Sequence, residues 1–141
     1  QMAGMECNPV SVELTYGLER ISMFVQKKNS VFDLIWNNEG VKYKDVFLDS
    51  EKQFSAYNFE FANTDSLFTI FDLTEKECHM LNEKKLPLPA YDQCLKASHV
   101  FNLLDSRGKI SVAERANYIS RVRDMAKNSG KIWLETMIKN G

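Results

Sequence analysis

Cysteine, histidine and long apolar runs are all scarce in this chain of 141 residues, which contains three cysteines and two histidines. The cysteines are odd in number, widely spaced and never arranged as C-x-x-C, so neither a disulfide framework nor a structural zinc site is indicated. No apolar run approaches the roughly 20 residues of a membrane span, and the N-terminus lacks a charged-then-apolar secretory leader. No Ser-His-Asp or Cys-His arrangement stands out. We therefore expect a soluble cytoplasmic protein with reduced thiols.

Charge is nearly balanced overall but unevenly distributed along the chain. Eighteen Lys and Arg residues against nineteen Asp and Glu residues give a net charge of −1, and 44% of residues are apolar. This composition excludes disorder and a polycationic nucleic-acid coat. Residues 49–83 hold eight acids and two lysines, whereas residues 107–131 hold seven basic residues and two acids. The asymmetry favours ion pairs between neighbouring helices, with a basic surface for RNA or a partner subunit as the alternative.

The first third of the chain has the pattern of a strand followed by a helix. Residues 2–7 are apolar enough for a strand, which Pro9 would end because proline has no amide hydrogen to donate. A helix is expected to start between residues 11 and 15 and to end near residue 26. Its predicted buried stripe recurs at spacings of four, three and four: Leu14, Leu18, Ile21 and Val25. Residues 31–48 fit either a short helix or an extended connection.

The sequence from about residue 49 onward predicts an antiparallel helical bundle. Capping boxes at residues 50–53 and 111–114 mark two helix starts, a further helix begins near Thr64, and another begins with proline in its first turn at residue 87. The last helix runs to about residue 139, with a weak point at Asn128-Ser129-Gly130. The helix from Thr64 is expected to turn Leu67, Phe68, Phe71 and Leu81 toward the core. The next helix is continued by an apolar repeat of Tyr91, Leu95, Val100 and Leu104.

Two arginines of the last helix fall on its expected apolar arc. Arg115 and Arg123 lie on that arc, whereas Arg121 points the other way. A buried guanidinium needs a partner, because leaving it alone costs several kcal/mol. The pattern favours a pair with an acid such as Asp105 or Glu60 over a contact with a subunit or nucleic acid. The apolar residues of the arc are Val112, Ile119, Val122, Ala126 and Trp133.

The segment from Glu13 to Arg20 carries the clearest chemical signal. On a helical wheel, Glu13, Gly17, Arg20 and Phe24 share a flank that holds an acid, a gap and a planar cation. A glycine inside a helix costs about 1 kcal/mol relative to alanine, so Gly17 suggests that a ligand approaches the backbone. A purine nucleotide is one candidate, since a guanidinium stacks on a flat ring and balances phosphate charge. The alternative is an exposed helix with a packing glycine.

The sequence Thr-Tyr-Gly-Leu-Glu-Arg at residues 15–20, preceded by Glu13 and by residues 4–10, resembles motif 3 of class II aminoacyl-tRNA synthetases. The form is that of the alpha subunit of the bacterial tetrameric glycyl-tRNA synthetases. Further segments resemble the C-terminal half of that subunit in the same order, so the resemblance covers essentially the whole chain. These segments are residues 30–36, 57–60, 86–91, 101–107 and 110–115.

This resemblance implies an alpha2-beta2 ligase that activates glycine with ATP and Mg²⁺ and transfers it to tRNA(Gly). It places Arg20 over the adenine and near the triphosphate, with Gly17 leaving room beneath. Glu19 would orient Arg20 or the nucleotide, and Glu13 and Thr15 would hold the glycine ammonium. Magnesium would be bound mainly by phosphates and by carboxylates outside this chain. The implied partners are a beta subunit, tRNA(Gly) and a second alpha subunit.

The resemblance also implies the fold class, an α+β fragment that is mostly α. Residues 1–48 would end the antiparallel-sheet catalytic core with the motif 3 strand and helix, and residues 49–141 would form a C-terminal helical domain. Motifs 1 and 2 of the family are absent from these residues, and the chain opens at Gln1 rather than at methionine. We therefore expect a fragment that is inactive alone. The alternative is a non-catalytic helical interaction module derived from a class II synthetase.

Overall fold

The computed structural model describes residues 1–139, which form two compact units. One unit comprises Gln1–Val10 together with the chain from Ala62 onward, and the other comprises Ser11–Phe61. The first unit is a helical bundle, and the second contains the segment with the predicted site residues. Within residues 1–139, no helix is long and apolar enough to cross a membrane.

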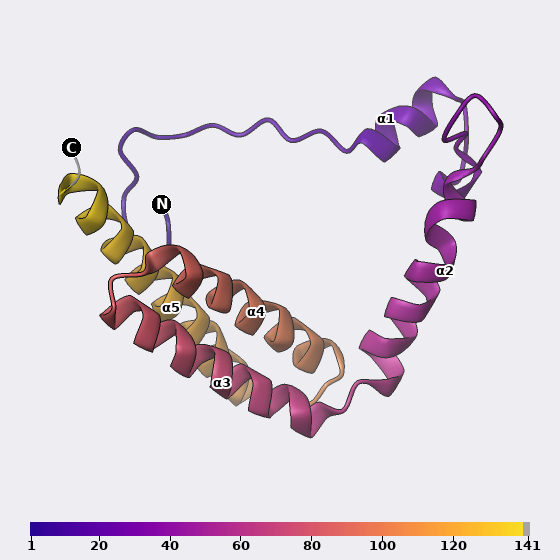
Figure 1. Cartoon of the computed structure of the whole chain (residues 1–141). Helices are drawn as coiled ribbons and strands as arrows, with labels where there is room; N and C mark the ends of the chain where they lie inside the picture. The colour runs from indigo at the N-terminus through magenta and orange to yellow at the C-terminus, as the bar shows by residue number, and fades with distance from the viewer. Residues whose placement is uncertain (140–141) are drawn as a thin grey trace. The chain divides into compact units, whose positions relative to one another are not determined.

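The bundle consists of α3 (Thr64–Glu83), α4 (Pro87–Ser106) and α5 (Val112–Lys139), which lie side by side and run antiparallel (Figure 1). The predicted starts of these three helices are confirmed. Asn63 caps α3 by accepting a hydrogen bond from the Ser66 amide at 2.9 Å, and α4 begins with a proline. The capping box of α5 is complete, because Ser111 Oγ accepts from the Glu114 amide at 3.2 Å and the Glu114 carboxylate accepts from the Ser111 amide at 3.1 Å.

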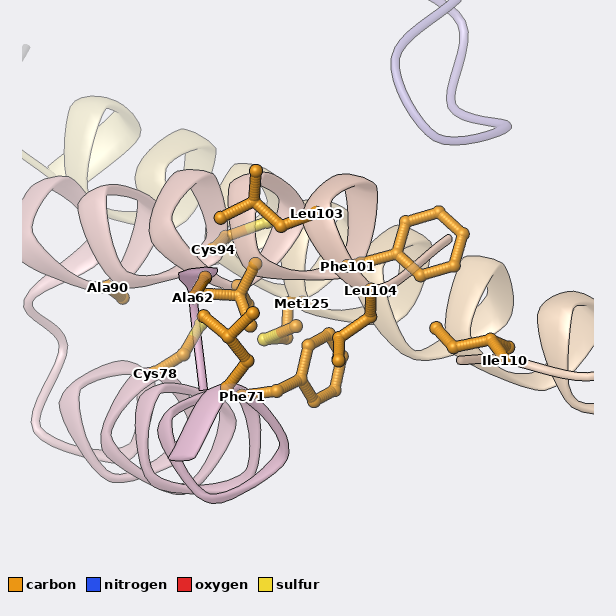
Figure 2. Close-up of a cluster of buried hydrophobic side chains, with 13 residues drawn as sticks. Ala62, Phe71, Cys78, Ala90, Cys94, Phe101, Leu103, Leu104, Ile110 and Met125 are labelled. Atoms are coloured by element: carbon orange, nitrogen blue, oxygen red, sulfur yellow. The ribbon is translucent and has the colours of Figure 1, made fainter. Parts of the chain in front are cut away.

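The core of the bundle lies where all three helices meet. Figure 2 shows Phe71 of α3 and Met125 of α5 among the clustered side chains, and both are fully buried. The first half of the α4 face in this cluster consists of small side chains, Ala90, Cys94 and Ala97, and the second half of the larger Val100, Phe101, Leu103 and Leu104. Small side chains let helices approach closely, which raises the packing density. Confirmed core or core-edge positions are Leu67, Phe68, Phe71, Leu81, Val100 and Leu104.

Two residues of the apolar repeat predicted for α4 are exposed. Tyr91 and Leu95 retain 44% and 52% of their accessible surface. The repeat follows large apolar side chains, whereas the buried face in this half of α4 follows the line of small residues through Cys94 and Ala97. Burying that line turns Tyr91 and Leu95 out of the core.

Arg121 joins α5 to α3 through ion pairs and ring contacts. Its guanidinium bonds to Asp72 at 2.6 Å and to Glu75 at 3.0 Å, both on α3, and lies over the rings of Phe71 and Tyr118 at 4.5 and 5.0 Å. The hydrogen bond to Glu75 is the largest cause of the raised pKa of Arg121. The expectation that Arg121 points away from the core is therefore wrong, whereas the predicted ion pairing between the acidic and basic segments is confirmed.

The other two arginines of α5 differ from each other. Arg115 pairs with Asp105 at 3.0 Å, which confirms one predicted partner. Arg123 is exposed and forms no ion pair with any residue in the described part of the chain. The predicted arc is confirmed in part, because Ile119, Val122 and Ala126 pack against the core. Val112 and Trp133 are exposed instead, since the most buried side chains of α5 are Met125 and Ser129.

At the predicted weak point of α5, the helix is unbroken and other segments pack closely against it. The helix continues through Asn128, Ser129 and Gly130, and Ser129 Oγ accepts a hydrogen bond from Asn82 of α3 at 3.1 Å. A side chain on Gly130 would overlap the terminal methyl group of Met2. Small residues here let α3 and the N-terminal turn approach α5.

The cysteines are free thiols, as expected, and two of them are buried. Cys7 is exposed, whereas Cys78 and Cys94 lie in the bundle core. Burial raises the pKa of Cys94 to about 11 and also raises the pKa of Cys78. Both buried thiols therefore stay protonated at neutral pH.

The strand predicted for residues 2–7 is wrong. Met2 and Met5 exchange two backbone hydrogen bonds of 2.9 Å across a tight turn, and Ala3 and Gly4 have φ values of 46° and 82°. A positive φ at both central residues reverses the chain, as in a two-residue hairpin turn. The mostly helical part of the expected fold is confirmed, whereas no β-sheet forms within residues 1–139.

Replacing Arg121 should destabilise the bundle, because Arg121→Ala leaves two carboxylates of α3 without their shared cation. We expect the free energy of unfolding in urea to fall by about 2 kcal/mol, the range of hydrogen bonds to charged groups. Arg123→Ala, on the exposed face of the same helix, should change it by no more than about 0.5 kcal/mol. Equal losses in the two variants would contradict the role assigned to Arg121.

Candidate functional site

The segment that carries the predicted site is extended, not helical. The helix α1 spans Leu18–Val25, and residues 11–17 have no regular secondary structure. The expected helix start between residues 11 and 15 is therefore wrong. β-Branched Val12 and Thr15 and the glycine at position 17 all disfavour helix in this segment. The predicted buried stripe is also wrong, since Leu14, Leu18, Ile21 and Val25 are exposed.

Glu13 and Thr15 form a local pair in this extended segment. Residues two apart in an extended chain project to the same side, and the Thr15 hydroxyl donates a short hydrogen bond to the Glu13 carboxylate. Both residues are exposed. An acid and a hydroxyl therefore lie together at the surface, available to a ligand.

Gly17 and Arg20 lie at the start of α1. Gly17 is the N-cap residue with φ of −75°, and a side chain there would meet only the Cβ of Arg20, at 3.9 Å. The exposed Arg20 forms no ion pair with any residue of the described chain. Because Glu13 lies outside the helix, the predicted single helical flank from Glu13 to Arg20 is wrong. The two groups are linked by an extended segment instead.

A hollow of about 330 Å³ lies beside α1 within the same unit. Among the predicted site residues, Glu19 lines it, whereas Glu13, Thr15, Gly17 and Arg20 do not. The remaining lining comes from α1, from the loop that follows it, and from the start of the next helix: Leu18, Ser22, Gln26, Leu34, Ile35, Trp36 and Tyr43.

Gln26 holds the loop beside this hollow. Its side-chain amide accepts a hydrogen bond from the Ile35 amide at 2.8 Å and donates one to the Ile35 carbonyl at 3.0 Å. This pair of bonds satisfies the backbone of Ile35 much as a neighbouring strand would. The role of Gln26 is not visible in the sequence, because a side chain that bonds across nine residues leaves no repeating pattern.

Residues 31–48, for which the sequence allowed either a short helix or an extended connection, contain a short helical turn, a loop and the first part of a longer helix. The 3₁₀ turn η1 (Val31–Asp33) leads into a tight loop, and α2 (Tyr43–Ala56) follows. Asp45 caps α2 by accepting from the Lys42 amide at 2.8 Å. The helix start predicted at residues 50–53 is therefore wrong, because that capping pattern lies inside α2. The π-helical turn η2 (Tyr57–Phe61) ends the unit.

Three aromatic rings stabilise the junction between the loop and α2. Trp36 packs edge-on against Tyr43 and Phe47, with ring centroids 5.8 and 5.2 Å apart. Such aromatic pairs contribute about 0.5–1.5 kcal/mol beyond the area they bury. Tyr43 and Phe47 are four residues apart on α2, a spacing that sequence inspection is able to find. The helix continues across residues 48 and 49, so no break marks the expected domain boundary, which stays a prediction.

The described residues offer no protein-built metal centre. No group of three His, Cys, Asp or Glu side chains within residues 1–139 is arranged to hold an ion. The side chains present therefore do not fit a magnesium ion held by this chain alone.

The comparison with known families accounts for both units. The family model described as glycyl-tRNA synthetase alpha subunit matches residues 1–137. The chain belongs to this family. The resemblance seen in the sequence is thus confirmed over the bundle as well as over the segment from Glu13 to Arg20. Membership makes the chain part of a tRNA synthetase, a ligase, and an alpha subunit implies a beta-subunit partner.

Removing the Gln26 side chain should loosen the loop beside the hollow. Gln26→Ala deletes both bonds to Ile35, and the loss of about 1 kcal/mol or more should speed hydrogen exchange of the Ile35 amide by about tenfold. Exchange measured by NMR on the intact chain tests this. Gln53→Ala, an exposed position on α2, serves as the control, and an unchanged Ile35 rate in Gln26→Ala would disprove the assignment.

Proposed function

We propose that this chain forms part of the catalytic site of a glycine–tRNA ligase, which activates glycine with ATP and transfers it to the 3′ end of tRNA(Gly). Membership of the glycyl-tRNA synthetase alpha-subunit family supports the proposal. The observation that carries it is local: an acid, a hydroxyl, a glycine and an arginine lie within residues 13–20, all exposed to a ligand.

In this proposal Arg20 and Gly17 bind the nucleotide. The guanidinium of Arg20 stacks on the adenine and neutralises negative charge on the phosphates. No described residue competes for it as an ion-pair partner, which keeps the cation available. Gly17 has no side chain to obstruct the base, and Glu19, one residue before Arg20, orients Arg20 or the nucleotide.

Glu13 and Thr15 bind the amino acid. The Glu13 carboxylate supplies the charge opposite to the glycine ammonium. The Thr15 hydroxyl, which already donates to Glu13, keeps its lone pairs free to accept a bond from that ammonium. A pocket without space for a β-carbon suffices to reject larger amino acids, because steric exclusion is easier than rejection of a smaller substrate.

The chemistry needs position and charge rather than a protein nucleophile. A glycine carboxylate oxygen attacks the α-phosphorus of ATP in line, and the bond to pyrophosphate breaks. A ribose hydroxyl of the tRNA then attacks the carbonyl carbon of the adenylate, and AMP leaves. Binding both reactants side by side, with Arg20 near the phosphates, lowers the barrier by proximity and electrostatic stabilisation.

The rest of this active site comes from outside the described residues. We propose a class II catalytic core in which an alpha–alpha dimer and upstream residues supply the other phosphate ligands, so that this chain alone is inactive. Magnesium would be held mainly by the phosphates of the nucleotide, and it would neutralise part of their charge. The cytoplasmic enzyme would act with its beta subunit and tRNA(Gly).

A non-catalytic interaction module derived from a synthetase is the second candidate. Exposed apolar side chains on the bundle favour an interaction module. Such a module, however, has no physical need for Glu13, Thr15, Gly17 and Arg20 in one short segment. Glycine-dependent exchange of pyrophosphate into ATP by the full-length alpha subunit with its beta subunit separates the two.

Arg20→Ala should lower kcat/KM for this exchange by about 10²-fold or more, because one preorganised charge on the phosphates is lost. Lys44→Ala removes an exposed cation of α2 and is the matched control, expected to stay within about twofold of the wild type. Exchange that is equally fast in Arg20→Ala and wild type would refute the role of Arg20.

Glu13→Gln keeps the size of the side chain but removes the charge opposite the glycine ammonium. We expect KM for glycine in the same exchange reaction to rise about 10- to 100-fold, as for loss of a charged hydrogen bond, with little change in KM for ATP. Glu51→Gln on α2 is the control. A rise in KM for ATP instead would move Glu13 from the amino acid to the nucleotide.

A further inference from the structure

An apolar hollow of about 250 Å³ opens between α4 and α5 at the end of the bundle where α4 begins. Leu88 and Tyr91 of α4 line one wall, and Trp133 of α5 lines the other. Met2 reaches over Gly130, which provides the floor of this hollow, named here the α4–α5 groove. A thioether side chain from a separate segment thus already lies against the groove.

Several large apolar side chains around the groove are exposed. Leu88 and Trp133 retain 71% and 43% of their accessible surface, and Tyr91, Leu95 and Met137 are exposed beside them. Isolated exposed apolar residues are normal, whereas a contiguous group marks an interaction site. Tryptophan, tyrosine and methionine are also the residue types enriched at protein–protein interfaces.

One border of the groove is positively charged. Arg123 precedes Gly130 by seven residues and therefore lies on the same side of α5 two turns away, and Lys127 lies one turn away. Neither cation forms an ion pair with another residue of the described chain. The α4 border carries no such excess, because Asp92 and Lys96 pair with each other at 2.8 Å.

We infer that the α4–α5 groove binds an amphipathic segment of the beta subunit, with apolar side chains seated against Trp133 and Leu88 and acidic side chains facing Arg123 and Lys127. A segment of this kind matches both the apolar walls and the basic border. This inference rests on the proposed assembly with a beta subunit.

Two other occupants fit the groove less well. A second copy of this bundle would bring its own Arg123 and Lys127 toward the same cations, if the contact were symmetric, and like charges repel. An RNA strand would satisfy the cations, but its phosphates would leave the walls of Leu88, Tyr91 and Trp133 without an apolar partner. Nucleic-acid interfaces are more polar than this surface.

The test measures the affinity of the full alpha subunit for its beta subunit by isothermal titration calorimetry. Trp133→Glu and, independently, Leu88→Glu place a charge in the groove at exposed positions, so thermal unfolding of the alpha subunit should be nearly unchanged. Each should raise Kd at least tenfold. Leu73→Glu is the matched control, because Leu73 is 60% exposed on α3 and does not line the groove; its Kd should stay within twofold.

The paired variant Arg123→Glu with Lys127→Glu tests the charge. It should raise Kd about tenfold and flatten the dependence of Kd on salt concentration. An unchanged Kd in both groove variants would overturn the inference. So would weaker tRNA binding with unaltered beta binding in the paired variant, or loss of alpha-subunit stability without beta in Trp133→Glu, which would assign the groove to RNA or to the alpha chain itself.

The binding measurement is independent of catalysis. Arg20→Ala should slow the exchange by about 10²-fold or more while leaving the Kd for beta unchanged, so a failure of the proposed activity would show in the exchange reaction alone. A failure of the groove assignment would show in the calorimetry alone.

Discussion

Close approach of α4 to its two neighbours is the constraint on which the bundle depends. The line of Ala90, Cys94 and Ala97 presents little volume, and it lies in the same buried cluster as Phe71 from α3 and Met125 from α5, which are both fully buried. Small residues also lie at a close contact on α5, at Ser129 and Gly130. A larger side chain at any of these positions would separate the helices before the large residues met, which is why overpacking of such seams is destabilising.

Charge in the bundle is divided between groups that hold helices together and groups that remain available. Arg121 is neutralised by two carboxylates and covered by two rings, and Arg115 is paired with Asp105. These cations are structural. Arg123 and Lys127, by contrast, form no ion pair with another residue of the described chain.

The segment from Glu13 to Arg20 follows a different principle from the bundle. Its groups are positioned by local bonds, such as that from Thr15 to Glu13, rather than by burial in a core. Exposed polar groups keep their affinity for ligands but have little rigidity of their own. A site of this kind gains precision when other residues enclose it, which agrees with our proposal that the catalytic centre is completed by further parts of the synthetase.

Local signals in the sequence determined the helix boundaries at Thr64, Pro87 and Ser111, the composition of the motif segment and the family. A cap or a proline acts within a few residues, so its effect is legible without a fold. Tertiary structure alone decided which faces are buried. Tyr91 and Leu95 recur at a helical spacing but are exposed. Arg121 is charged, yet its guanidinium lies over the rings of Phe71 and Tyr118. Burial depends on residues that are distant in the chain, which periodicity does not record. The turn from Met2 to Met5 and the extended segment of Glu13 and Thr15 are local, but neither has a repeating pattern that periodicity could detect.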